Sequence, residues 1–160
     1  MTEDARPVVV AFDGSAEAQE AVRAAVALFG TRRLLVVSVW EPGLAMTMMS
    51  TPDTSGLAYA APDADQIMAV DEAQREHATS TADAGAALAR ELGATAEALS
   101  VPDSANIAAT VVGIADQHDA AALVVGSRGL GAMKSRLLGS TSRAVLHETH
   151  RPVLIVRAAD

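Results

Sequence analysis

The stretch Val8–Ser15, VVVAFDGS, decides the fold. Its apolar first part predicts a buried strand, and the Asp-Gly-Ser that follows predicts a turn into a helix. That helix is expected to run to Phe29, with Ser15 as its cap and Gly30 at its end. A second apolar strand over Leu34–Trp40 completes a βαβ unit, whose crossover must be right-handed.

The rest of the chain continues the alternation of strands and helices. The expected elements are a helix over Gln66–Leu92 that stops at Gly93, a strand over Ala94–Val101, a helix over Ser104–His118 opened by Asp103 or Ser104, a strand over Ala121–Val125, a helix over Thr141–Thr149 and a strand over Pro152–Val156. This order predicts an α/β fold, a doubly wound open sheet of five parallel strands (order 3-2-1-4-5) with helices on both faces. The length of 160 residues fits one domain, residues 1–160.

Residues 41–65 interrupt the pattern. They contain Pro42, Pro52 and Pro62 among glycines, serines and methionines. The segment is longer than the usual connection in a compact domain. Two interpretations stay open: a mobile flap beside a ligand, or a flexible insertion.

Composition excludes several classes of protein. There is no cysteine, which rules out disulfides and thiolate metal sites. No signal peptide and no apolar run of membrane-spanning length is recognisable, so we expect a cytoplasmic protein without a membrane partner. The net charge of −8 argues against nucleic-acid binding. Basic residues nevertheless gather between Ala120 and Arg157, where the only acid is Glu148. This cationic part is either the seat of an anion or a solvated face.

The stretch Gly126–Ser142, GSRGLGAMKSRLLGSTS, follows the fourth strand. Its glycines allow positive φ and let the main chain approach a ligand closely. Gly139 then opens a helix whose first-turn amides and dipole favour a phosphate, and the hydroxyls of Ser140 and Ser142 add donors. Arg128, Lys134 and Arg136 would screen charge. Open sheets of this class bind ligands where the strand order reverses, here at the ends of the first and fourth strands.

Two well-known phosphate signatures do not fit this stretch. The P-loop needs a glycine where Met133 stands, and the dinucleotide fingerprint needs its third glycine where Lys134 stands. What is present is Gly126-x-x-Gly129, nine residues, then Gly139-Ser140. This spacing resembles the ATP-binding signature of the universal stress protein family.

The resemblance extends to both ends of the chain. Val9–Ser15 is similar to the family's first strand and its Asp-bearing turn, and Ser142–Val145 with Arg151–Val156 is similar to its closing helix and strand. The match covers the chain except the loop at 41–65, which varies in the family. It implies an ATP-binding protein of the family's single-domain branch, with ADP or AMP as other possible ligands and Mg²⁺ carried by the phosphates.

The resemblance also implies roles for individual residues. Asp13 would bind the ribose hydroxyls and the main chain of Val39 would contact adenine, while Ala11 stands where the family often has proline. The expected cofactor-binding residues are Ala11, Asp13, Val39, Gly126, Arg128, Gly129, Gly139, Ser140, Thr141 and Ser142. Each also has a purely structural interpretation: Asp13 or Ser15 as a helix cap, the glycines as turns, Arg128 as a solvated cation.

No catalytic residue and no protein metal site is expected. His147 and His150 have a spacing that suits a metal, but surface histidines near a helix C-terminus are the preferred interpretation. The family implies slow or absent hydrolysis, so we expect a nucleotide-dependent stress-response or signalling module with an unknown protein partner. A slow ATPase or phosphotransfer protein and a non-nucleotide interaction protein are the alternatives. The apolar strand at 152–157, which the family uses for dimers, predicts a two-fold homodimer.

Overall fold

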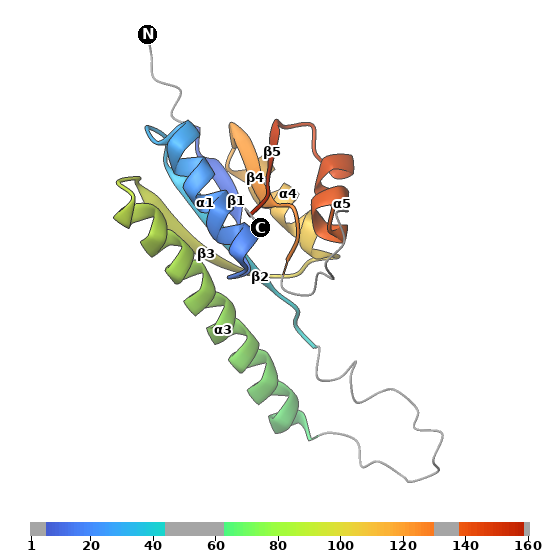
Figure 1. Cartoon of the computed structure of the whole chain (residues 1–160). Helices are drawn as coiled ribbons and strands as arrows, with labels where there is room; N and C mark the ends of the chain where they lie inside the picture. The colour runs from blue at the N-terminus through green and yellow to red at the C-terminus, as the bar shows by residue number, and fades with distance from the viewer. Residues whose placement is uncertain (1–5, 44–62, 130–137, 159–160) are drawn as a thin grey trace.

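The protein is described by a computed structural model that covers residues 6–43, 63–129 and 138–158. Its strands are β1 (Val8–Ala11), β2 (Leu34–Trp40), β3 (Ala96–Pro102), β4 (Ala122–Gly126) and β5 (Val153–Val156); its helices are α1 (Ala16–Phe29), α3 (Ala64–Glu91), α4 (Ile107–Gln117) and α5 (Ser140–Glu148). The strands form one sheet in the order β3-β2-β1-β4-β5, and every pair is parallel (Figure 1). The predicted fold class and strand order are confirmed.

The two faces of the sheet carry separate cores, because successive side chains of a strand point to opposite faces. Val8 and Val10 pack with residues of α1 and α3. Val9 packs instead with residues of α4 and α5, among them Val111 and Val145. The core under α4 and α5 is aliphatic, and the core under α1 and α3 is aliphatic except for Phe12 and the partly buried Phe29. The two faces are therefore covered by different helix pairs.

The turn from β1 into α1 follows the sequence prediction closely. Ser15 is the N-cap of α1, and its Oγ accepts a hydrogen bond of 3.1 Å from the Ala18 amide. Gly14 has a φ of +83°, in the region that favours glycine. Residues 12–15 therefore leave the sheet in a tight turn at the carboxyl end of β1.

Helix α3 lies close to the sheet because its inner face is built from small residues. Its buried positions are Ala78, Ala82, Gly85, Ala86 and Ala89, all in the C-terminal half. A Cβ on Gly85 would stand 2.8 Å from both Phe12 and Val36, so the helix touches the sheet at this point. Figure 1 shows the N-terminal half of α3 running past the sheet. The predicted stop at Gly93 is confirmed by its φ of +93°.

The start of α4 differs from the prediction. The helix begins at Ile107, and its cap is Asn106, whose Oδ1 accepts from the Ala109 amide at 2.8 Å. Asp103 and Ser104, the predicted caps, belong to the preceding turn. The Asp103 carboxylate accepts from the Ala105 amide, an interaction that orders a turn and leaves the helix start to Asn106.

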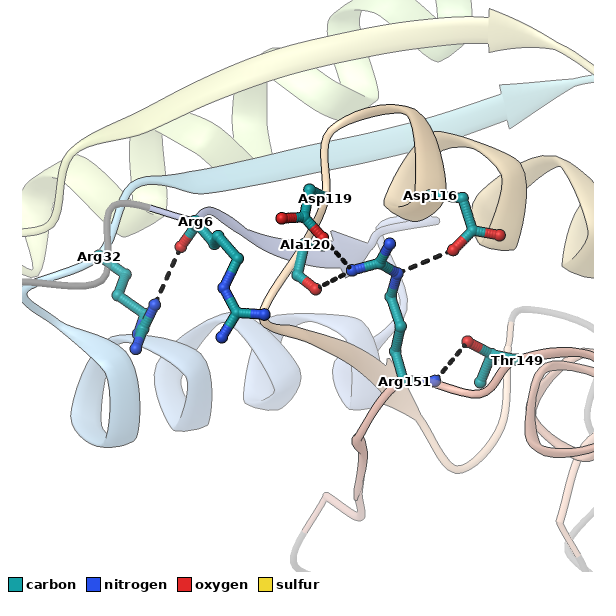
Figure 2. A network of polar contacts seen from close by, with 7 residues as sticks. All are labelled: Arg6, Arg32, Asp116, Asp119, Ala120, Thr149 and Arg151. Atoms are coloured by element: carbon teal, nitrogen blue, oxygen red, sulfur yellow. Dashed lines mark hydrogen bonds and ion pairs between the residues drawn. The ribbon is translucent and has the colours of Figure 1, made fainter.

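The entry to β5 is fastened to the end of α4 (Figure 2). The guanidinium of Arg151 donates to Asp116 at 2.8 Å, to Asp119 at 3.0 Å and to the Ala120 carbonyl. Its amide donates to the Thr149 hydroxyl. Arg151 therefore fixes the last strand to the turn that precedes β4.

Most of the predicted loop at 41–65 lies outside the described residues, which resume at Asp63. Ala64 and Asp65 already belong to α3. None of the described helices combines the length and apolar character that crossing a membrane requires. That the whole chain is one domain stays a prediction.

Candidate functional site

A cavity of about 450 Å³ opens at the carboxyl ends of β1, β2 and β4. It lies where the strand order reverses, since β1 pairs with β2 on one side and with β4 on the other. All the residues expected to bind a cofactor line it: Ala11, Asp13, Val39, Gly126, Arg128, Gly129, Gly139, Ser140, Thr141 and Ser142. The structure thus brings together residues from three separated segments of the chain.

The floor of the cavity is held by hydrogen bonds between the end of β4 and the start of α5. The Gly139 amide donates to the Ser127 carbonyl at 2.8 Å, and the Ser142 hydroxyl donates to the Gly126 carbonyl at 2.7 Å. Ser127 and Ser142 are both 3% exposed. The ends of the Gly-rich stretch are therefore closed on each other, while residues 130–137 lie outside the described residues.

The first turn of α5 faces the cavity with main-chain amides. The first intrahelical bond runs from the Arg143 amide to the Gly139 carbonyl, so the amides of Ser140, Thr141 and Ser142 have no acceptor within the helix. The cap residue, Gly139, has no side chain to accept from them. Together with the positive end of the helix dipole, these amides make a favourable place for an anion.

The hydroxyl of Ser142 has a different role from the one its position in the sequence suggests. It is directed at the Gly126 carbonyl as a donor and is buried. The proton of this hydroxyl is therefore used within the protein. Ser140 is exposed at the helix start.

The three glycines of the signature, Gly126, Gly129 and Gly139, differ in how much space surrounds them, and none has a positive φ. A Cβ on Gly126 would stand 2.9 Å from Glu17 Cβ, and one on Gly129 would stand 2.6 Å from Asp13 Oδ2. A Cβ on Gly139 would meet only ordinary contacts, the nearest being the Ser127 carbonyl at 3.4 Å. Contacts with the described residues therefore do not demand a glycine at 139, which lines the cavity.

Asp13 is not the cap of α1, because Ser15 has that role. One carboxylate oxygen of Asp13 accepts from the Ser15 amide at 3.0 Å, which orients the side chain. The other oxygen faces Gly129 across the cavity mouth. The carboxylate is therefore held at the cavity by its own turn.

Val39 lies beyond the last β1–β2 pair, which is Ala11 with Val37. The Arg33 carbonyl accepts a hydrogen bond from the Val8 amide, and the Val37 carbonyl accepts one from the Phe12 amide. The main-chain groups of residues 33 and 37 therefore point toward β1. Because main-chain groups alternate in direction along a strand, Val39 also directs its amide and carbonyl toward the β1 side. β1 has already ended there, so these groups face the cavity.

The apolar wall of the cavity was not predicted from the sequence. It consists of Phe12, Ala18, Val37, Ile107, Val111 and Val125, and Ser38 also lines the cavity. Most of them come from strands and from the first turns of α4. Their apolar character appears in the sequence as ordinary core pattern, which gives no signal that they border a cavity.

Arg128 is at the cavity and is also paired. Its guanidinium lies 2.9 Å from the carboxylate of Glu17, in the first turn of α1. It is therefore not the solvated cation of the structural interpretation. Lys134 and Arg136, the other predicted screening charges, lie outside the described residues.

Within the ranges 6–43, 63–129 and 138–158, no three His, Asp or Glu side chains gather as a metal site would need. His147 and His150 are exposed, in agreement with the surface interpretation.

Comparison with known proteins agrees with this architecture. The profile of the universal stress protein family matches residues 5–157. Comparison of the sequence with curated proteins finds no match.

Three solved structures illustrate the similarity of the fold. The universal stress protein UspA from Lactobacillus plantarum superposes with a TM-score of 0.73 at 19% identity, covering 98% of this chain and 100% of the other. A universal stress protein in complex with cAMP gives a TM-score of 0.63 at 24% identity, covering 98% and 100%. The universal stress protein from Archaeoglobus fulgidus in complex with dAMP gives 0.61 at 22% identity, covering 94% and 97%.

Proposed function

The chain belongs to the universal stress protein family, and from this premise we propose that it binds an adenine nucleotide, ATP in the first place, in the cavity at the ends of β1 and β4. It would act as a nucleotide-dependent stress-response module with little or no hydrolysis of its own. The observation that carries the proposal is the start of α5. Three main-chain amides without helical acceptors stand there beside a glycine that the fold does not need.

The cavity offers a suitable environment for each part of a nucleotide. Its volume of about 450 Å³ lies within the range of about 300–1,000 Å³ typical of small-molecule sites. The apolar side chains of Ile107 and Val111 would pack on the base, and the main chain of Val39 would bond its edge. The Asp13 carboxylate is an acceptor for the ribose hydroxyls, and the α5 amides would hold phosphate.

The two nucleotide complexes described above support adenine as the base. Both ligands, cAMP and dAMP, are adenine nucleotides, and both proteins share this fold along almost their whole length. ATP, rather than ADP or AMP, is proposed from the resemblance of the signature at 126–140. Mg²⁺ would accompany the phosphates of the ligand.

Little hydrolysis is proposed because the two carboxylates that lie beside Arg128 and Gly129 are engaged. Glu17 is paired with Arg128, and Asp13 accepts from the Ser15 amide and is assigned to the ribose. Hydrolysis requires a group that orients or activates a water at the terminal phosphate. Single-turnover assays with labelled ATP test this part of the proposal, and rapid release of phosphate would overturn it.

Assembly, location and partner are also proposals. We propose a homodimer that forms through the C-terminal strand at 152–157. This segment contains β5, which is an edge strand of the sheet. The cytoplasmic location and the unknown protein partner stay predictions.

Calorimetric titration of the purified chain with ATP and Mg²⁺, with AMP and with GTP tests the binding proposal. We expect saturable binding of the adenine nucleotides with a clear preference over GTP. Nucleotide released from freshly purified protein by denaturation and identified by mass spectrometry is an independent readout. A well-folded chain that binds neither ATP nor AMP at millimolar concentration would show that the proposal is wrong.

A further inference from the structure

The ion pair between Glu17 and Arg128 joins the cavity to α1. The guanidinium and the carboxylate are 2.9 Å apart, and their side chains are only 26% and 14% exposed. Among the described lining residues, Asp13 and Arg128 are the charged ones. Arg128 thus places a positive charge at the cavity, and its ion-pair partner, Glu17, is not among the residues that line the cavity.

The packing of α1 on β4 fixes this pair. The space beside Gly126 is filled by Glu17 itself, since a Cβ there would stand 2.9 Å from Glu17 Cβ and 3.0 Å from its carbonyl carbon. The Ser15 cap holds the same turn in place. Glu17 also lies in the first turn of α1, where the helix dipole favours a negative charge. The carboxylate is therefore placed on Arg128 by the fold.

The pair controls how much positive charge a ligand meets. A partly buried carboxylate next to a guanidinium offsets much of its field, because such pairs are screened less than exposed ones. A phosphate entering the cavity either competes with Glu17 for Arg128 or binds while Arg128 stays paired. In both cases the Glu17 charge opposes the ligand, and the opposition grows with the charge of the phosphate chain.

We propose that Glu17, through its ion pair with Arg128, sets the preference of the cavity among nucleotides of different phosphate charge. The inference rests on the proposed nucleotide-binding function. Glu17 is a positioning residue here: it holds and neutralises Arg128 and does not itself touch the ligand.

The test compares three ligands that share the base and ribose but differ in charge: adenosine, AMP and ATP. Their affinities are measured by calorimetry for the wild type, Glu17→Gln, Arg128→Gln and the double variant. Glu20→Gln is the matched control, because it removes the same charge from the same helix at a pair with Arg23 whose side chains are 44% and 41% exposed. Thermal unfolding of each variant checks the fold.

We expect Glu17→Gln to strengthen ATP binding by about fivefold, AMP binding by less, and adenosine binding not at all, an effect on the scale of one ion pair. Glu20→Gln should leave all three affinities unchanged. Arg128→Gln should weaken ATP most, and adding Glu17→Gln to it should restore part of the ATP affinity, because the unpaired Glu17 charge would otherwise still oppose the phosphates. The Arg128 variants test the pair from its other side if Glu17→Gln folds poorly.

Two results would overturn the inference while the proposed function stands. One is a wild type that binds nucleotide together with a Glu17→Gln variant that shifts adenosine, AMP and ATP by the same factor. The other is a Glu20→Gln variant that changes the ranking as much as Glu17→Gln does. A wild type that binds none of the three ligands would overturn the proposed function, and this inference with it.

Discussion

The hydroxyl of Ser142 donates a hydrogen bond of 2.7 Å to the carbonyl of Gly126, and so ties the first turn of α5 to the last residue of β4. Both residues line the cavity. The bond is buried with Ser142, which is 3% exposed. This side chain therefore helps to fix the start of α5 against the sheet, together with the hydrogen bond from the Gly139 amide to the Ser127 carbonyl.

Removing that side chain should lower stability. Ser142→Ala leaves the Gly126 carbonyl without this donor, and we expect a loss of about 1 kcal/mol in the free energy of unfolding. Urea unfolding without ligand measures it. Ser140→Ala is the control, since Ser140 is exposed and the change should stay within about 0.5 kcal/mol. Equal losses in the two variants would contradict the assigned role of the bond.

Variants of Gly139 should separate effects on ligand binding from effects on folding. Gly139→Ala and Gly139→Val should weaken ATP binding, by about tenfold or more for valine, because the new side chain enters the space proposed for phosphate. The fold should survive, since a Cβ there meets ordinary contacts. Calorimetry and thermal unfolding give the two readouts.

Gly113, inside α4, provides the matched control for these variants. Apart from the backbone of α4 itself, no atom of the described residues would lie within 4 Å of its added Cβ. Gly113→Ala should raise stability by about 0.5–1 kcal/mol and leave ATP affinity unchanged. If Gly139→Ala unfolds the chain, or binds ATP as tightly as the wild type, the role given to Gly139 is wrong.

Asp13 is expected to recognise the ribose. Asp13→Asn retains an oxygen for the Ser15 amide but exchanges the other acceptor for a donor. We expect about tenfold weaker binding of ATP and almost no change for 2′,3′-dideoxy-ATP, in line with the loss of charge-assisted hydrogen bonds. The ratio of the two affinities is the measurement. A variant that keeps the wild-type ratio would mean that the carboxylate does not bind the ribose.

Arg151 should contribute to stability across the whole working pH range. Its hydrogen bond to Asp116, and secondly that to Asp119, raises the pKa of Arg151 above the ordinary arginine range. A cation whose pKa is raised by folding stabilises the fold at every pH below its unfolded value and loses this effect only as pH rises through the folded value. Neither value is approached between pH 5 and pH 9, a range about three units below any arginine pKa.

Replacement of Arg151 measures that contribution. Arg151→Ala should cost about 1–2 kcal/mol in the free energy of unfolding, because the buried Ala120 carbonyl loses a donor. Arg151→Lys should restore only part, since an ammonium lacks the planar fork that reaches several acceptors. Urea unfolding at several pH values tests both. A loss for Arg151→Ala that disappears at pH 9 would contradict this assignment.

The proposed dimer depends on the outer edge of β5. The Pro152 and Val156 carbonyls accept hydrogen bonds from the amides of Leu123 and Ser127, so these positions of the strand face β4. Because main-chain groups alternate in direction along a strand, the amide and carbonyl of Ile155 point away from β4. Ile155→Pro should therefore abolish dimerisation while β5 stays paired with β4. Ile155→Ala loses the same packing but keeps the amide, and it should remain dimeric. Sedimentation velocity at micromolar concentration decides, and a monomeric wild type would contradict the dimer.

The fold could be predicted because its signals are local. The apolar run before Ser15, the cap at Ser15 and the stop at Gly93 depend on neighbouring residues alone, and the structure confirms them. The start of α4 was predicted wrongly for the same reason, because local sequence alone does not choose among several capping residues. Asp103, Ser104 and Asn106 are all good caps, and only the turn made by Asp103 shows that Asn106 opens the helix.

The residues chosen from the sequence line the cavity, whereas its apolar wall and the pairing of Arg128 were not predicted. Glycines and a helix start are visible as spacing, which is why Gly126, Gly129 and Gly139 were found. The pairing of Glu17 with Arg128 joins residues far apart in the chain, and no periodicity announces it. Lining residues such as Ile107 have the same pattern as core residues.

The cavity is bordered by Asp13 near the beginning of the chain and by the first turn of α5 near its end. A molecule bound to both would form a reversible, non-covalent link between two parts of the chain that are far apart in the sequence. A compound that binds only the folded chain adds its binding free energy to the resistance against unfolding. The resistance of this protein to unfolding would then rise with the concentration of the bound molecule.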